Sequence, residues 1–317
     1  MMKSPVLLIT YRRYDTTKRV FQSIKRAQPP VLYFASNGPK PAHAKEVSEV
    51  AQVRSLISEV DWPCEVKTLI RDEHLDVKAS VAGAIDWFFA HEPEGIVLED
   101  DCLPAVDFYR FCDDMLERFR EVDQVSVISG VCRQPVGFEA PSSYYFSKYV
   151  HIWGWATWRR TWDLYDRDLS FWPHWQNSPQ WKTLFRHRHE ERYWRSRFDS
   201  TFRGDTVTWD YQLMASVWRA RGLTLTPAVN LVSNIGFGDG ATFTKNTENP
   251  LSAAPTFPIY PLTHPTALVT NDAADEFDFE YRFNGRLERF PHRYARRIGK
   301  WVQKRVFDPL YVRLRGH

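Results

Sequence analysis

Short apolar runs alternate with amphipathic segments along the first hundred residues, and this alternation limits the fold more than any other feature of the sequence. The apolar runs, which are predicted strands, are Val6–Thr10, Val31–Ala35, Cys64–Ile70 and Ile96–Leu98. The segments between them, which are predicted helices, are Asp15–Ala27, Lys45–Val60 and Val77–Ala90. Strands that alternate with helices form a mostly parallel sheet with right-handed crossovers. We therefore predict an α/β fold whose central sheet is flanked by helices.

The alternation continues only a little further before the composition changes. Phe108–Phe119 is a predicted helix and Val125–Ser129 a predicted buried strand. Residues 142–230 then hold ten of the thirteen Trp residues and show poorer periodicity. Aromatic side chains stack on the flat faces of sugar rings, but they also fill cores. The length of 317 residues fits one large α/β domain with additions, or two small domains.

Three adjacent carboxylates, Glu99, Asp100 and Asp101, follow the fourth predicted strand. Adjacent carboxylates repel one another, and Mn²⁺ or Mg²⁺, which prefer oxygen ligands, would neutralise them. In an open α/β sheet, ligands bind outside the carboxyl ends of the strands, where this triplet is expected to lie. We therefore predict a metal site that is shared with the phosphates of a ligand. The alternative is a solvated acidic turn.

Two further strand ends carry polar residues that could reach the same edge of the sheet. Arg12 and Arg13 follow the first strand, and an arginine there suits a diphosphate because its fork of donors matches phosphate oxygens. Asn37 follows the second strand, where its amide could read a uracil-like base. The alternatives are a pair of surface arginines and an ordinary Asn-Gly turn.

An aromatic segment, residues 151–158, places Gly154 between Trp153 and Trp155. A glycine flanked by indole rings lets a ligand approach the backbone beneath a stacking wall. A tight turn packed in the core is the alternative.

Asp210 precedes the predicted helix Leu213–Ala220 and has no Lys or Arg as a sequence neighbour. Such a carboxylate is a candidate general base that accepts a proton from a sugar hydroxyl, and a helix N-cap is the alternative. The glycine-rich residues 234–245 lack the strand-to-helix setting of a phosphate-binding loop. We interpret them as a lid over a donor substrate or as a passive loop.

The order of these segments over residues 5–245 resembles the GT-A nucleotide-sugar transferases. More narrowly, it is similar to N-acetylglucosaminyltransferase I and to bacterial haemolytic-protein-like glycosyltransferases. The resemblance is carried by the arginine after the first strand, Val97-Leu98-Glu99-Asp100-Asp101, Trp153-Gly154-Trp155, Trp209-Asp210-Tyr211 and the small-residue loop. It implies a Rossmann-like GT-A fold and a transferase that moves a sugar from a nucleotide-diphosphate donor, a UDP-sugar by expectation, to a glycan or lipid-linked acceptor.

The resemblance also implies roles for single residues. Asp101 corresponds to the ligand of Mn²⁺, while Glu99 and Asp100 correspond to contacts with the ribose and the sugar of the donor. Arg13, or Arg12, corresponds to the arginine that supports the nucleotide. Asn37 lies near the position that contacts uracil, and Asp210 matches the catalytic base of an inverting reaction.

Two other functions fit parts of this pattern. A sugar-phosphate nucleotidyltransferase would use the same metal and nucleotide, but such enzymes usually carry a Gly-rich signature with a Lys after the first strand, in place of Tyr11-Arg12-Arg13. A non-enzymatic protein that binds membranes through its carboxyl-terminal tail is the second alternative.

The chain divides by sequence into three parts. Residues 1–245 form the predicted glycosyltransferase domain, with a nucleotide-binding part (1–130) and an acceptor part (131–245). Residues 246–285 are a Pro-containing segment that is predicted to be irregular. Residues 286–317 are a basic tail with a net charge of +8, which leaves −5 for residues 1–285 out of the overall +3.

The tail is a candidate for contact with an anionic membrane surface. Pro291–Val306 can form one helix in which basic residues line a stripe beside an apolar face, as an interfacial helix requires. A helix packed on the body of the protein is the alternative. Nucleic acid is not an expected partner, because the rest of the chain is acidic.

Cysteine usage and hydropathy bear on location. The four cysteines form no Cys-x-x-Cys pair and are predicted to be free thiols in a reducing compartment. No leader of signal length begins the sequence, and no apolar stretch reaches the roughly 18 residues of a membrane-spanning helix. We therefore expect a cytoplasmic protein, with the tail as its only candidate contact with the inner face of a membrane.

Overall fold

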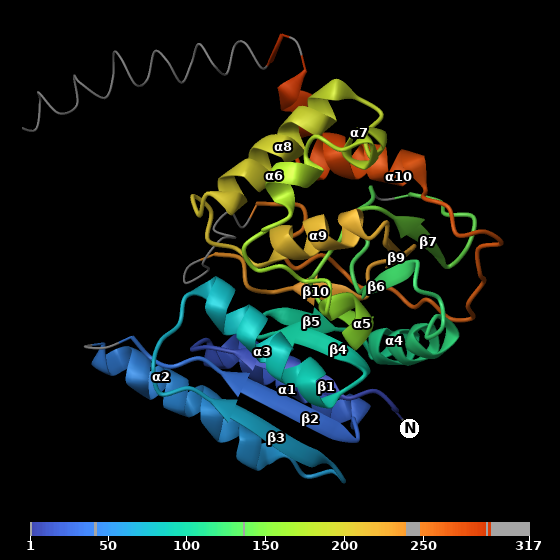
Figure 1. Ribbon diagram of the computed structural model, residues 1–317. Coiled ribbons are helices and arrows are strands. Elements are labelled where there is room, and N and C mark those ends of the chain that lie inside the picture. The colour runs from blue at the N-terminus through green and yellow to red at the C-terminus, as the bar shows by residue number, and fades with distance from the viewer. Residues whose placement is uncertain (1, 41–42, 136, 239–247, 290, 293–317) are drawn as a thin grey trace, which may run out of the picture.

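The computed structural model describes residues 2–40, 43–135, 137–238, 248–289 and 291–292, and its centre is an eight-stranded sheet in the order β3-β2-β1-β4-β8-β6-β9-β7 (Figure 1). The strands of this sheet are β1 (Val6–Thr10), β2 (Val31–Ser36), β3 (Glu65–Ile70), β4 (Glu94–Glu99), β6 (Val125–Ser129), β7 (Tyr144–Ser147), β8 (Trp155–Trp158) and β9 (Leu223–Pro227). Two short strands, β5 (Cys102–Pro104) and β10 (Val232–Asn234), pair separately and antiparallel.

The central sheet is mostly parallel, as the sequence predicts. β3, β2, β1 and β4 pair in parallel, and so do β6 and β9. β8 is antiparallel to both β4 and β6, so β6 and β9 run in the direction of β4, and only β8 and β7 are reversed in this sheet. The predicted α/β, Rossmann-like fold is thus confirmed. The sheet is continuous from strands of the part predicted to bind the nucleotide to strands of the part predicted to bind the acceptor.

Helices cover the sheet and extend beyond it. They are α1 (Tyr14–Ala27), α2 (Ala44–Arg54), α3 (Val77–His91), α4 (Val106–Arg118), α5 (Arg159–Trp162), α6 (Trp172–Trp175), α7 (Pro179–Thr183), α8 (Arg188–Phe202), α9 (Asp210–Arg219) and α10 (Asp272–Phe277). Figure 1 shows the first βα units at one end of the molecule and helices α6, α7, α8 and α10 gathered at the other, with α9 nearer the middle.

Several predicted bounds differ from the structure by one or two residues, and three predicted segments differ by more. The helix predicted over Lys45–Val60 ends at Arg54 and continues as a 3₁₀ helix, Ser55–Glu59, in which the hydroxyls of two serines bond back to backbone carbonyls. The helix predicted to begin at Leu213 begins at Asp210. The segment predicted as irregular, 246–285, contains α10 and a π-helical turn, Asp278–Arg282, which follow a cap by the side chain of Asn271.

Alternate residues of each central strand face opposite sides of the sheet and join two separate hydrophobic clusters. In β1, for example, Val6 and Leu8 belong to one cluster, whereas Leu7 and Ile9 belong to the other. Burial on both faces explains why the strands read as apolar runs rather than as alternating patterns. The fully buried tryptophans all lie in the second cluster; they are Trp155, Trp172, Trp181, Trp194 and Trp218. The abundance of Trp therefore mainly reflects packing against one face of the sheet.

The register of the parallel strands brings their polar ends together. Thr10 lies opposite Ser36, and Ile9 lies opposite Glu99, so the residues after β1, β2 and β4 share one edge of the sheet. The pairing of β5 with β10 places Asn234 opposite Cys102, and the backbone N–H of Ile235 donates to the carbonyl of Asp101. Residues 232–235 thus lie beside the segment that begins with Asp101.

Two predictions lie largely outside the described residues. The predicted tail helix Pro291–Val306 is one of them, and the loop 234–245 is described only as far as Gly238. Among the helices that the structure describes, none is both long enough and apolar enough to cross a membrane.

Candidate active site

A pocket of about 430 Å³ lies at the carboxyl edge of the sheet. Its walls come from the loops after β1 and β4 and from much later segments. Its polar and aromatic lining consists of Arg13, Glu99, Asp101, Arg133, His151, Trp153, Thr206, Thr208, Trp209, Asp210, Tyr211, Asn234, Arg282 and Phe283. The pocket therefore unites Arg13, part of the acidic triplet and Asp210, which are far apart in sequence.

Arg13 forms ion pairs with two of the three adjacent carboxylates. Its Nη2 donates to Asp100 Oδ1 at 2.8 Å and to Asp101 Oδ2 at 2.6 Å, while its Nη1 donates to the carbonyl of Gly236 at 3.1 Å. Burial alone would lower the pKa of Arg13, but the two ion pairs raise it above its usual value. The guanidinium is therefore permanently charged and is fixed between the triplet and the loop after β10.

Negative charge still exceeds positive charge around the triplet. Burial raises the pKa of Asp100, although the Arg13 guanidinium counteracts this. Burial, together with the charges of Asp101, Asp100 and Asp210, raises the pKa of Glu99 well above its usual range. A protonated Glu99 can donate a hydrogen bond to a ligand, and an arriving cation would favour its ionisation.

Asp101 is the residue of the triplet that could hold a cation. Asp101 Oδ2 is paired with Arg13, whereas Asp101 Oδ1 receives a weak contact from the Cys102 thiol at 3.5 Å. Carboxylate oxygens are ligands that Mn²⁺ and Mg²⁺ prefer. Within the described part of the chain, no group of three or more His, Cys, Asp and Glu converges as a metal cage. Asp101 would hold a cation together with ligand phosphates and water.

Asp210 is held at the start of α9. The Thr208 hydroxyl donates to its carboxylate, as do the backbone N–H groups of residues 210 and 211. Trp209, not Asp210, is the N-cap residue of this helix. Burial raises the pKa of Asp210, while these hydrogen bonds and the charge of Arg133 oppose the rise. A carboxylate that binds its proton more tightly than usual is a stronger base, as general-base chemistry requires.

Asn37 and Arg12 are not among the residues that line the pocket. The side-chain oxygen of Asn37 accepts from the backbone N–H groups of Gly38 and Leu75, at 3.0 and 3.1 Å, and its nitrogen donates to the Leu75 carbonyl at 2.9 Å. These bonds tie two loops together, which favours the turn interpretation of Asn37. Arg12 lies within 4 Å of two glutamates of α2, so Arg13 is the arginine that the fold directs into the pocket.

The predicted stacking wall is only partly in the pocket. Trp153 lines it, while Trp155 is buried in β8 and stacks on Trp209 with ring centroids 6.0 Å apart. Gly154 has φ +64°, and a Cβ atom there would lie 2.8 Å from a methyl group of Val232. The group that approaches Gly154 closely is thus the side chain of Val232, in the protein's own core.

Gly154→Ala is expected to lower the free energy of unfolding by about 2–4 kcal/mol, from a left-handed backbone and an overpacked methyl group. Gly204→Ala is the matched control, because Gly204 has φ +76° and a Cβ atom there would meet no other atom within 4 Å. It should show only the backbone cost of about 1–2 kcal/mol. Chemical denaturation measures both, and equal losses would contradict the packing role of Gly154.

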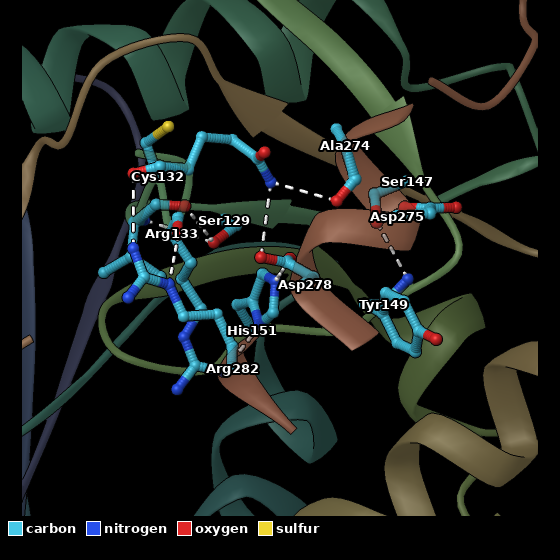
Figure 2. A network of polar contacts seen from close by, with 12 residues as sticks. Ser129, Cys132, Arg133, Ser147, Tyr149, His151, Ala274, Asp275, Asp278 and Arg282 are labelled. Atoms are coloured by element: carbon cyan, nitrogen blue, oxygen red, sulfur yellow. Dashed lines mark hydrogen bonds and ion pairs between the residues drawn. The ribbon is translucent and has the colours of Figure 1, made fainter. Parts of the chain in front are cut away.

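Several lining residues were not predicted from the sequence. Arg133, His151 and Arg282 come from three segments, and Figure 2 shows them in one polar network with Asp278. Arg133 follows β6 as Arg13 follows β1, so its position after a buried strand was a usable signal. Arg282 had no such signal, because it lies in the π-helical turn of a segment that was predicted to be irregular.

No protein-family model matches the chain, and no curated protein sequence matches it. Solved structures with similar folds include an apo UDP-glucose pyrophosphorylase, with a TM-score of 0.38 and 8% identity over 74% of this chain and 93% of the other.

Two further similar structures are named as transferases. The putative nucleotide-diphospho-sugar transferase of Desulfovibrio desulfuricans G20 has a TM-score of 0.35 and 10% identity, over 71% of this chain and 78% of the other. The glycosyltransferase GlyE of Streptococcus pneumoniae TIGR4 has a TM-score of 0.34 and 12% identity, over 71% of this chain and 45% of the other. Similarity of this degree says nothing about substrate or reaction.

Proposed function

We propose that the protein is a GT-A-type glycosyltransferase that moves a sugar from a nucleotide-diphosphate donor to an acceptor hydroxyl. The observation that carries this proposal is that Arg13, Asp101 and Asp210 line the same pocket. A guanidinium between carboxylates provides one wall, suited to a diphosphate with a shared cation. The carboxylate of Asp210, whose pKa is raised by burial, provides another wall of the pocket. A UDP-sugar is the expected donor.

The acceptor is expected to be a glycan, free or lipid-linked. Trp153, Tyr211 and Phe283 line the pocket together with Asp210, and aromatic faces stack on the apolar faces of sugar rings. An acceptor hydroxyl beside Asp210 would therefore have a flat apolar surface on which its ring can rest.

The proposed reaction is an inverting displacement at the anomeric carbon. Asp210 accepts the proton of the acceptor hydroxyl, whose oxygen forms a bond to that carbon while the bond from the carbon to the diphosphate oxygen breaks. The nucleoside diphosphate leaves from the opposite face, where Arg13 provides positive charge. A cation bound to Asp101 would neutralise the leaving group as a Lewis acid.

Incubation with Mn²⁺ and a panel of nucleotide sugars tests the proposal directly. The expected result is release of a nucleoside diphosphate that accelerates when a glycan acceptor is added. Formation of a nucleotide sugar from a sugar phosphate, with release of pyrophosphate, would identify a nucleotidyltransferase instead. A chain that turns over none of these substrates would contradict both enzymatic functions.

Asp101→Asn is expected to remove Mn²⁺-dependent binding of the nucleoside diphosphate, because the amide keeps the shape of the side chain but loses its charge. Calorimetric titration of UDP with and without Mn²⁺ measures the effect, and the expected loss is at least tenfold in Mn²⁺. Asp123→Asn, at a side chain that is 94% exposed, is the control and should bind like the wild type. Equal UDP affinity in Mn²⁺ for Asp101→Asn and the wild type would refute the role of Asp101.

A further inference from the structure

Arg133 and Arg282 line the same pocket, and neither guanidinium group has a carboxylate as its hydrogen-bond partner within the described residues. Arg282 donates to the backbone carbonyls of Arg133 and Gln134. Arg133 Nη1 lies 3.3 Å from His151 Nδ1, and Arg133 Nε is buried without any hydrogen-bond partner. All these acceptors are neutral, and the negative charge of Asp278 acts on both guanidinium groups without a hydrogen bond to either.

The nearest carboxylate is already engaged. Asp278 Oδ2 lies 2.7 Å from His151 Nε2, and Asp278 Oδ1 accepts from Gln134 at 3.2 Å (Figure 2). Burial lowers the pKa of His151, so the ring is neutral near pH 7. Its Nε2–H then donates to Asp278, and its Nδ1 accepts from Arg133. The histidine thereby fixes the orientation of Arg133 without neutralising it.

Two guanidinium groups at one wall, neither of which donates to a carboxylate of the described residues, leave donors that a ligand can use. Burial lowers the pKa of Arg133, the charge of Asp278 opposes this, and the charge of Arg282 lowers the pKa further. A buried charge without a partner destabilises a protein by several kcal/mol, and the natural complement of an arginine fork is an oxyanion, a phosphate or a carboxylate.

We propose that Arg133 and Arg282 form an oxyanion-binding site for a phosphate or carboxylate group carried by the acceptor. The oxyanion would receive hydrogen bonds from the terminal guanidinium N–H groups that the protein leaves unused. Asp278 and His151 are positioning residues for this site, because they act through Arg133.

The assignment to the acceptor rests on the proposed function. In an inverting displacement, the leaving diphosphate and the attacking hydroxyl lie on opposite faces of the anomeric carbon. Arg13 and Asp101 mark the diphosphate side. Arg133 and Asp210 line the same pocket, and each side chain's charge acts on the other. The oxyanion is thus on the side of the base, next to the hydroxyl that reacts.

Titration of the metal-free full-length protein with inorganic phosphate tests the site without turnover. Phosphate should bind and raise the melting temperature of the wild type, and Arg133→Met or Arg282→Met should weaken its affinity at least tenfold. The control is Arg203→Met, at an exposed arginine paired with Asp205, which should bind phosphate like the wild type. Arg133→Met should not melt earlier than the wild type in phosphate-free buffer, because it removes an unpaired charge.

A second arm, phosphate titration at saturating UDP, separates the two sources of the oxyanion. Unchanged phosphate affinity places the anion on the acceptor, whereas competition places it on the donor diphosphate and overturns the acceptor assignment. Wild-type protein that binds no phosphate, or variants that bind it as tightly as the wild type, would overturn the site itself. Neither readout depends on glycosyl transfer, so failure of the proposed function is detected separately by the nucleotide-sugar panel.

Discussion

Asp210→Asn is expected to reduce the rate of glycosyl transfer by about 10²–10⁴-fold while leaving donor affinity unchanged. The amide keeps the size of the side chain and can still accept from the Thr208 hydroxyl, but it cannot take a proton. General-base assistance is typically worth this factor. Steady-state kinetics with a nucleotide sugar that the wild type uses measures the rate of transfer. Titration with UDP measures the affinity for the nucleotide of the donor.

The pH profile adds a second readout of the same residue. Because burial raises the pKa of Asp210, the wild-type rate should already fall on acidification above the ordinary Asp value of about 3.9. This acid limb should be absent from the residual activity of Asp210→Asn. Asp205→Asn, in the loop before α9, is the control, because Asp205 pairs with Arg203 at the surface. If Asp210→Asn turned over normally but melted earlier, Asp210 would have only a structural role.

The sequence predicts the sheet well because its strands are buried on both faces. Val6–Thr10 and Val125–Ser129 appear with the predicted bounds, since an apolar run of that length between helices has few other uses. Parallel pairing then places Arg13 and the triplet at one edge without further information. That part of the site follows from topology alone.

The other wall of the pocket could not be derived in the same way. Arg133 and Arg282 meet through a π-helical turn whose sequence is acidic and aromatic and shows no strand or helix pattern. Its position depends on contacts such as that of Asp278 with His151, across more than 120 residues. Local pattern carries no information about such contacts. The same limit explains why Asn37, at a correctly predicted strand end, binds a neighbouring loop instead of lining the pocket.

The neutralisation of the triplet also differs from the prediction in one physical respect. The repulsion between Asp100 and Asp101 is reduced without a metal ion, because Arg13 Nη2 lies 2.8 Å from Asp100 and 2.6 Å from Asp101. A shared cation is thus a proposal for the ligand-bound enzyme, whereas Arg13 stabilises the site within the chain itself.

Arg13→Met is therefore expected to destabilise the protein by about 3–5 kcal/mol at pH 7, since removal of one partner leaves buried carboxylates unpaired. Arg12→Met is a matched control at the adjacent residue. Its side chain is 39% exposed, and its guanidinium lies 3.6–3.7 Å from its acidic partners, so the substitution should cost less than about 1 kcal/mol. Urea denaturation of both variants measures the difference.

The destabilisation should depend on pH with a defined sign. Burial already raises the folded-state pKa of Asp100, and without Arg13 that pKa rises further above its unfolded value. Groups shifted in this direction stabilise the folded state below the unfolded pKa, and this stability is lost as the pH rises through the folded pKa. The deficit of Arg13→Met relative to the wild type should therefore shrink on acidification, and Asp100→Asn in the same chain should recover part of it at pH 7. A deficit that is equal at pH 5 and pH 8, or no larger than that of Arg12→Met, would show that the bridge contributes little to the folded state.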